Sequence, residues 1–360
     1  MLLTIFVFLL VLSLLVLVHE LGHYIAARQM GMSVEEFGFG FPPRLFGKKD
    51  RNGMLWSVNL IPLGGFVRIK GENGEKRGEH DAFAQKSIPA RLYVLFAGVI
   101  MNFLLAWVLF TAGFMFGLPS IIEGVDYKSA IISNRAVNVM QVLSESPAHK
   151  AGLSEGDQIT AIDGKTYANG EEARAALVPH ADGSPVHVVF THDGGTKEAD
   201  IIPEFNAEAG RPIIGVAIVE TGTVRFPFYV APIKGLVTTA GMTYDIVGAF
   251  VGLIAGLFQH RNVAADLSGP IGIASLTGQV ARLGFWHLVQ FAALLSVNLA
   301  VLNAIPFPAL DGGRALFVFV EAVRRKPNSL QFEQAAHTIG FALLILLVLF
   351  VTYKDIVKLF

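Results

Sequence analysis

The sequence predicts a polytopic α-helical membrane protein with about four transmembrane helices, a membrane-associated β-hairpin and one inserted β-rich domain. The composition is the first observation behind this prediction. Of 360 residues, 53% are hydrophobic and only 16% are charged, and the mean hydropathy is +0.54, outside the range of ordinary soluble domains. Long uncharged apolar runs and a central stretch of soluble-type composition are the other two observations.

The expected transmembrane helices cover residues 2–18, 92–118, 286–310 and about 339–352. The second and third are long enough to cross a hydrocarbon layer of roughly 30 Å. The first continues directly into a charged motif without a small-residue cleavage site, which favours a retained helix over a signal peptide. Residues 235–258 are apolar but glycine-rich and contain Asp245, so the sequence alone leaves open whether they enter the membrane.

Basic residues predict the orientation of these helices. Residues 28–91 carry eleven Lys or Arg residues, and Arg324, Arg325 and Lys326 follow the third helix. The positive-inside rule places both segments in the cytoplasm, so the first helix runs inward. Asp311 follows the third helix, and it can reach the inner end of the first helix only if the third helix also runs inward. The second helix runs outward, so an even number of crossings must separate helices two and three. Residues 235–258 are therefore expected not to span alone, and the soluble domain is expected outside the cytoplasm.

The first basic loop contains a candidate hairpin. Phe37, Phe39 and Phe41 alternate at period two, and Trp56, Val58 and Leu60 do so after a turn-rich stretch. Such a hairpin can enter the membrane only where protein covers its backbone polar groups. The alternative is an ordinary cytosolic hairpin whose aromatic side chains pack on one another.

Two histidines and a glutamate end the first apolar run, in the pattern His19-Glu20-Leu21-Gly22-His23. Histidines four residues apart on a helix differ in direction by only about 40°, so both imidazoles can bind one tetrahedral metal ion, with Glu20 beside them as a base for water. Ionisable groups in a transmembrane helix are costly and therefore usually functional. The competing explanation is that they only mark the membrane interface.

A zinc site of this kind needs a further protein ligand. Asp311 is the only acidic residue between Trp286 and Leu316, which makes it the candidate. Read alone, it could equally be a helix N-cap. The chain has no cysteine, so thiolate ligands and disulfides are excluded. A site of two histidines and one carboxylate favours one Zn²⁺ ion.

The chain's motifs, taken in order, resemble the site-2 protease family. HELGH lies on the first helix, "SPAHKAGLSEGDQITAIDG" in the middle resembles a bacterial PDZ domain, and "NAIPFPALDGG" lies near the end. The segments "AGVIMN" (97–102) and "LSGPIGI" (267–273) also fit, with Val99 where the family usually has proline. More narrowly, the order resembles the bacterial regulator-of-sigma-E proteases, although many of those have two PDZ domains.

The resemblance implies His19, His23 and Asp311 as zinc ligands, Glu20 as general base and acid, and Asn298, Asn303 and Pro306 as substrate-binding residues. It divides the chain into an N-terminal membrane part (1–118), a PDZ domain (121–205), an extracytoplasmic linker with membrane-associated helices (206–284) and a C-terminal membrane part (285–360).

The implied activity is intramembrane hydrolysis of single-pass membrane proteins within the lipid bilayer of a bacterial inner membrane. The substrates would be anti-sigma factors or remnant signal peptides that another protease has already trimmed, with the active site toward the cytoplasm. The alternatives are a non-catalytic PDZ scaffold and a pro-sigma-factor processing protease. A net charge of −1 gives no basic field, so no nucleic-acid partner is expected.

Overall fold

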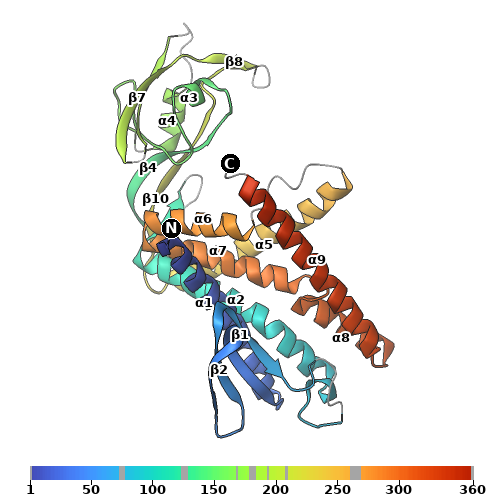
Figure 1. Ribbon diagram of the computed structural model, residues 1–360. Coiled ribbons are helices and arrows are strands. Elements are labelled where there is room, and N and C mark those ends of the chain that lie inside the picture. Colours follow the sequence, from blue (N-terminus) through green and yellow to red (C-terminus); the bar gives the residue numbers. More distant parts are fainter. Residues whose placement is uncertain are drawn as a thin grey trace. The chain divides into compact units, whose positions relative to one another are not determined.

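The computed structural model describes residues 2–72, 78–122, 129–167, 169–177, 184–192, 194–206, 210–259 and 269–357. The chain divides into two compact units. One unit combines Met1–Ala112 with Pro232–Phe360, and the other is Gly113–Ala231. The first unit holds most of the helices together with a long hairpin, and the second is rich in β-structure (Figure 1).

Long apolar helices dominate the chain. They are α1 (Leu2–Gln29), α2 (Ile88–Phe116), α5 (Ala231–Phe258), α7 (Phe285–Ala304) and α9 (Leu330–Val357). Shorter helices are η1 (Phe83–Gln85), α6 (Pro270–Leu283) and α8 (Asp311–Arg324). Among the described residues, five helices are long and apolar enough to cross a membrane: the four expected and α5.

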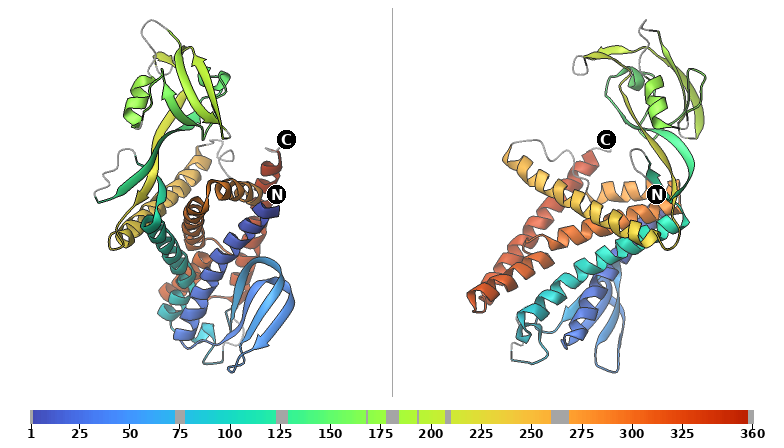
Figure 2. Two further views of the ribbon diagram at one scale, coloured as in Figure 1. Left: turned by 90° about the vertical axis from the view of Figure 1, so that its left-hand side faces the viewer. Right: turned by 180° about the vertical axis from the view of Figure 1, so that it is seen from behind.

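Contacts along α1 show that α7 runs parallel to it. Ala292 of α7 packs with Val11 and Leu15 of α1, and further along the chain Asp311 lies against His23. At the other end, a side chain on Gly278 of α6 would collide with Thr4, which places α6 beside the start of α1. Both views of Figure 2 show α6 beside the N-terminal end of α1. Parallel α1 and α7 are the arrangement that the crossing-parity argument required.

Helix α5 is a single continuous helix, and only 6% of its apolar window is buried by the rest of the protein. Length and composition alone would let it cross a membrane. Since α7 runs parallel to α1, a spanning α5 would need a second crossing before α7. Helix α6 has 14 residues, about 21 Å, and is too short to supply it. That α5 does not span alone therefore stays a prediction, with this support.

Strands β1 (Val34–Lys49) and β2 (Leu55–Ile69) form an antiparallel hairpin that folds back on itself. Their paired segments lie in the order 61–69, 34–41, 55–59, 44–49, because residues such as Phe37 pair with both Val67 and Trp56. The hydroxyl of Ser13 donates to the carbonyl of Pro62 at 2.9 Å. The hairpin thus reaches the middle of α1, which favours the membrane-associated prediction over an ordinary cytosolic hairpin.

The second unit is built on a six-stranded sheet with the order β3-β10-β4-β5-β6-β7. Its strands are β3 (Leu118–Ile121), β4 (Ile131–Val142), β5 (Gln158–Ile162), β6 (Val186–His192), β7 (Gly195–Ile201) and β10 (Val216–Arg225), and β8 (Glu204–Asn206) pairs with β9 (Arg211–Ile213). Two short helices, α3 (Pro147–Lys150) and α4 (Gly170–Ala176), complete it. Ser146 caps α3 by accepting from the backbone N–H of His149.

This unit extends beyond the expected 121–205 boundaries on both sides. Strand β10 lies in what the sequence assigned to the linker, yet it pairs with β3 on one side and β4 on the other. Its side chains alternate between buried and half-buried along most of its length. The short β8–β9 pair separates it from the rest of the domain in sequence, which is why the composition suggested that the domain had already ended.

Candidate metal centre

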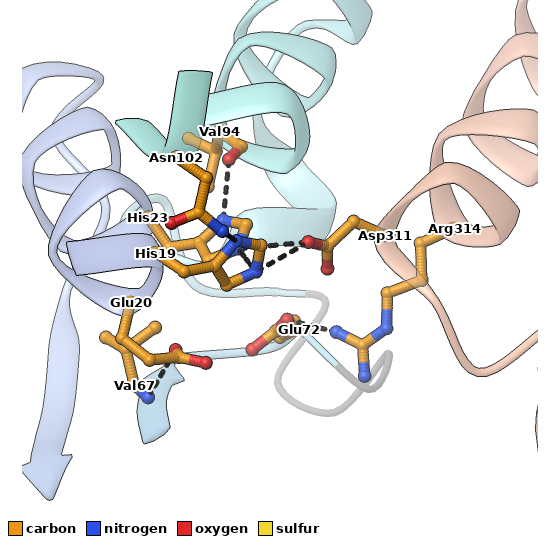
Figure 3. A network of polar contacts seen from close by, with 9 residues as sticks. All are labelled: His19, Glu20, His23, Val67, Glu72, Val94, Asn102, Asp311 and Arg314. Carbon is orange, nitrogen blue, oxygen red and sulfur yellow. Dashed lines mark hydrogen bonds and ion pairs between the residues drawn. The ribbon is translucent and has the colours of Figure 1, made fainter. Parts of the chain in front are cut away.

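Three side chains from distant parts of the chain meet at one point. His19 and His23 lie on α1 and are buried, and Asp311 is the first residue of α8. The Nε2 atoms of His19 and His23 are 3.2 Å apart, and the Asp311 Oδ2 lies 3.0 Å from the first and 3.2 Å from the second. Figure 3 shows the three groups converging from α1 and α8.

The triangle has the dimensions of one face of a tetrahedral zinc site. With metal–ligand bonds of about 2.0–2.1 Å, tetrahedral ligands lie about 3.3 Å from one another. The three measured separations, 3.0 to 3.2 Å, are close to that value. Two imidazoles and one carboxylate with a fourth position left over are the ligand set of a catalytic rather than a structural zinc site.

A backbone carbonyl fixes the orientation of His23. Its Nδ1 lies 2.8 Å from the carbonyl oxygen of Val94 on α2. A carbonyl only accepts, so Nδ1 must carry the proton and Nε2 must present its lone pair. Zinc-binding histidines are commonly held in this way by a partner on the far nitrogen.

The side chain of Asn102 fixes the orientation of His19. Its side-chain amide, fully buried on α2, approaches the Nδ1 of His19 to 3.3 Å, while its Oδ1 has no hydrogen-bond partner. If the Nε2 of His19 binds metal, Nδ1 is a donor, and only the oxygen of the amide can bond to it. Amide oxygen and nitrogen are assigned from the surrounding network, and this network requires Oδ1 to face His19.

Asn102→Asp and Asn102→Leu should therefore behave differently. Aspartate still accepts from His19 Nδ1, so we expect zinc affinity within about tenfold of the native protein, whereas the similarly sized leucine should weaken it about 10–100-fold. Competition with a chelator of known affinity measures both. Ser296→Ala is the matched control, because that hydroxyl bonds only the backbone carbonyl of Asn102. Equal affinities for the Asp and Leu variants would contradict the tautomer argument.

Glycine lets α2 approach the histidines closely. A Cβ on Gly98 would lie 2.5 Å from His23 Nε2 and 2.6 Å from His19 Cε1, far inside contact distance. The same holds at the start of α8, where a Cβ on Gly312 would meet the carbonyl oxygen of Ile305 at 2.3 Å. Glycine therefore sets how near α2 comes to the histidines of α1 and how near the start of α8 comes to the end of α7.

Glu20 lies next to the ligands but points toward the hairpin (Figure 3). Its Oε2 accepts a hydrogen bond of 3.0 Å from the backbone N–H of Val67. Residues 61–69 form an outer strand of the hairpin sheet, so a carboxylate next to the metal site contacts the edge of that sheet. This contact brings the candidate base and the candidate substrate strand together.

Asp311 is not the cap of α8. Leu310 occupies that position, and the carboxylate of Asp311 bonds the two imidazoles instead. One turn later, Arg314 forms an ion pair with Glu72, which follows β2. The first turn of α8 is thus held on both sides, by α1 and by the segment after the hairpin.

The expected substrate-binding residues lie near the end of α7 and just beyond it. The amide of Asn298 donates to the Leu294 carbonyl of its own helix at 3.1 Å. Asn303 is half-buried, and Pro306 is exposed in the connection between α7 and α8. The Asn303 amide makes no hydrogen bond within the described part of the chain. Asn298, Asn303 and Pro306 all stay predictions as substrate contacts.

Residues 7–347 match peptidase family M50. The chain belongs to this family. The zinc metalloprotease RasP of Geobacillus kaustophilus is 32% identical, over 98% of this chain and 97% of that protein. The regulator of sigma-W protease RasP of Bacillus subtilis is 30% identical, over 99% of each. A solved PDZ domain of the SdrC-like protein from Listeria monocytogenes is 30% identical and covers 23% of this chain and 85% of that domain, with a TM-score of 0.21.

Membership of the M50 peptidases makes the chain an integral membrane metallopeptidase of the site-2 type, as the sequence predicted. The sequence alone assigns no role to two residues near the candidate metal ligands. Gly98 and Asn102 both fall in the segment "AGVIMN", which fits the family but does not itself indicate a metal site. Their spacing of four residues on α2 puts both on the face that meets His19 and His23.

The inserted domain of this M50 peptidase has a groove of its own. A cavity of about 590 Å³ lies between α4 and β10, with Met140, Leu177 and Ile218 among its lining residues. Strand β3 pairs only with residues 221–224 of β10. On that side residues 216–219 of β10 have no strand partner within the described residues, although the Ile218 carbonyl accepts a hydrogen bond of 2.7 Å from the Arg174 guanidinium of α4.

Proposed function

We propose that the chain hydrolyses peptide bonds within the transmembrane segments of single-pass membrane proteins, with one zinc ion held by His19, His23 and Asp311. The observation that carries the proposal is the 3.0 to 3.2 Å triangle of ligand atoms with Glu20 on the adjoining turn. His19, Glu20 and His23 lie on α1, a helix that is long and apolar enough to span the membrane. Charged groups at such depth are costly, so their presence indicates a function.

Zinc bound there supplies a Lewis acid for the scissile carbonyl and lowers the pKa of water toward 7. The carboxylate of Glu20 takes the proton from the attacking water and returns it to the leaving amine. The histidine orientations set by Val94 and Asn102 keep both Nε2 lone pairs available. The surrounding apolar helices exclude bulk water, which strengthens these polar interactions.

The hairpin offers a strand edge to which an unwound substrate segment can bind. A scissile bond inside a hydrogen-bonded helix is inaccessible, so the substrate must unwind locally. The outer strand 61–69 borders α1 at Glu20. An extended substrate segment that adds to this edge regains the backbone hydrogen bonds lost on unwinding. Val67 would then donate to the substrate or remain on Glu20, depending on the register of the added strand.

We further propose that the substrates are already trimmed, as anti-sigma factors or remnant signal peptides would be. The Bacillus subtilis relative is a regulator of sigma-W protease, which supports a role in sigma-factor regulation over pro-sigma-factor processing. The inserted domain, with its groove of about 590 Å³, acts as a docking site or size filter. A purely non-catalytic scaffold would have no need for the complete ligand set.

The decisive test is cleavage by the purified full-length protein of a panel of single-pass membrane proteins, each in trimmed and untrimmed form. We expect cleavage within the transmembrane segment of trimmed substrates, loss of activity with a zinc chelator, and recovery on adding zinc. Cleavage that survives complete removal of metal would overturn the proposal.

The localisation that we propose is a bacterial inner membrane, with the inserted domain outside the cytoplasm and the metal site toward it. The chain is free of cysteine, so a single cysteine reports its own side. A cysteine at exposed Glu155 should react with a membrane-impermeant thiol reagent in cells whose outer barrier has been opened, and one at exposed Lys326 should not. The opposite labelling pattern would invert this orientation.

A further inference from the structure

One face of the hairpin sheet carries two rows of side chains that continue across three strand segments. The deeper row is Phe39, Val58 and Phe46, and the shallower row is Phe37, Trp56 and Lys48. Residues two apart on a strand share a face, so these rows form one continuous surface. Trp56 is 42% exposed and Phe46 is 64% exposed. Phe37 is buried against Tyr24 and Trp56, so the uncovered apolar surface is formed mainly by Trp56, Val58 and Phe46.

A cavity of about 790 Å³ lies on this face. Its walls include Leu17 of α1, the aromatic rows, and the cationic side chains Lys48, Lys49 and Arg51 near the hairpin turn. Leu17 is two residues from His19, about 200° around the helix. The groove thus lies on the side of α1 away from the metal ligands, so it is separate from the proposed active site.

The polarity of the groove follows membrane depth. Pro62 lies at the level of Ser13, midway along α1. Trp56 lies at the level of Tyr24, near the inner end of α1, and the two ring centroids are 5.8 Å apart. Lys48 pairs with Trp56, while Phe46 pairs with Val58, one step deeper. Apolar side chains therefore occupy the deep end of the groove and cations the shallow end, at the expected cytoplasmic surface.

The cations have no partners among the described residues. Lys48, Lys49 and Arg51 make no ion pair with any part of the chain that the structure describes, and all three are exposed. The nearby Asp50 uses its Oδ1 to accept from the backbone N–H groups of Asn52 and Met54 within its own turn. Asp50 also lines the groove, so three positive charges and one negative charge, a net charge of +2, lie at its mouth.

We propose that this groove binds an anionic phospholipid of the cytoplasmic leaflet. The headgroup phosphate contacts Lys48, Lys49 and Arg51, and an acyl chain lies along Phe46, Val58 and Phe39. Charge complementarity selects this occupant, because the cytoplasmic leaflet is rich in anionic lipid and each nearby basic residue strengthens the attraction. A neutral lipid fills the apolar part equally well but leaves the net positive charge at the mouth without a counter-charge.

Trp56 gives a local readout of occupancy. Trp107 and Trp286 are the other two tryptophans, and replacing both with phenylalanine leaves Trp56 as the single emitter. The full-length protein is placed in mixed bilayers containing phosphatidylglycerol or phosphatidylcholine with brominated acyl chains, which quench tryptophan on contact. We expect brominated phosphatidylglycerol to reach half-maximal quenching at about tenfold lower mole fraction than brominated phosphatidylcholine.

Replacing Lys48, Lys49 and Arg51 with glutamine should reduce that preference to less than about twofold. The matched control replaces Arg324, Arg325 and Lys326, the other cytoplasmic basic cluster, and should retain it. Should the single-tryptophan protein fail to fold, native mass spectrometry of otherwise native and charge-substituted protein compares the anionic lipid retained.

Equal quenching by the two lipids overturns the proposal, as does an unchanged preference in the glutamine variant. The proposal is also overturned if the glutamine variant keeps its lipid preference but cleaves substrates with acidic cytoplasmic flanks more slowly. That result would mean that Lys48, Lys49 and Arg51 bind the substrate. The quenching and mass-spectrometry measurements do not depend on the proposed proteolytic activity. Only the comparison of cleavage rates does.

Discussion

Replacing Glu20 with glutamine is expected to abolish proteolysis while leaving bound zinc in place. Glutamine has nearly the same shape and can still accept from the Val67 N–H, so the local fold should persist. It cannot take a proton from water, and loss of a general base typically lowers the rate by about 10²–10⁴-fold. Metal analysis of the purified variant together with the cleavage assay measures both effects.

The informative comparison is Asp311→Ala, which removes the proposed third ligand atom, 3.0 Å from His19 Nε2 and 3.2 Å from His23 Nε2. That variant should lose zinc and activity together, whereas Glu20→Gln should lose activity alone. Substantial residual cleavage by the glutamine variant would show that another group serves as the base. Unchanged zinc content in the alanine variant would mean that the third ligand lies elsewhere.

The membrane explains why the sequence predicted so much of the fold. Apolar runs long enough to cross a bilayer must be helical, because unpaired backbone groups are too costly there. Each of the four expected spans coincides with a long helix, although the second runs two residues past the end of α2 and the third runs six residues past the end of α7. The parity argument anticipated that α7 runs parallel to α1. His19 and His23 could be paired from spacing alone, since a helix brings residues four apart to one face.

Contacts between helices could not be predicted in the same way. Asn102 and Gly98 act on α1 from α2, and nothing in their spacing says which neighbour they face. The sequence predicts the hairpin as two strands in which apolar and polar residues alternate. In the structure, repeated shifts of register divide these strands into four adjacent segments. Register shifts depend on local backbone geometry, which residue alternation does not encode. Strand β10 was missed because its partners β3 and β4 are distant in sequence.

Gly98→Ala is expected to lower zinc affinity by about 10–100-fold, comparable to the loss of an outer-shell partner. The added methyl group would lie 2.5 Å from His23 Nε2 and within 2.8 Å of His19 Nδ1, so one or both rings must rotate away from the ligand position. Alanine raises helix propensity relative to glycine, which excludes a weaker helix as the cause. The measurement is chelator competition, combined with the visible absorption of the cobalt-substituted protein as a report on tetrahedral geometry.

The control for this prediction is Gly248→Ala on α5, where an added Cβ meets nothing within 4 Å. Both substitutions place the same methyl group on an apolar helix, so a general effect of alanine on folding or membrane insertion should appear in both variants. Only Gly98→Ala should lose zinc and the tetrahedral cobalt spectrum. If the two variants bind zinc equally well, α2 does not limit the space around the histidines, and the close approach of Gly98 has no role in the metal centre.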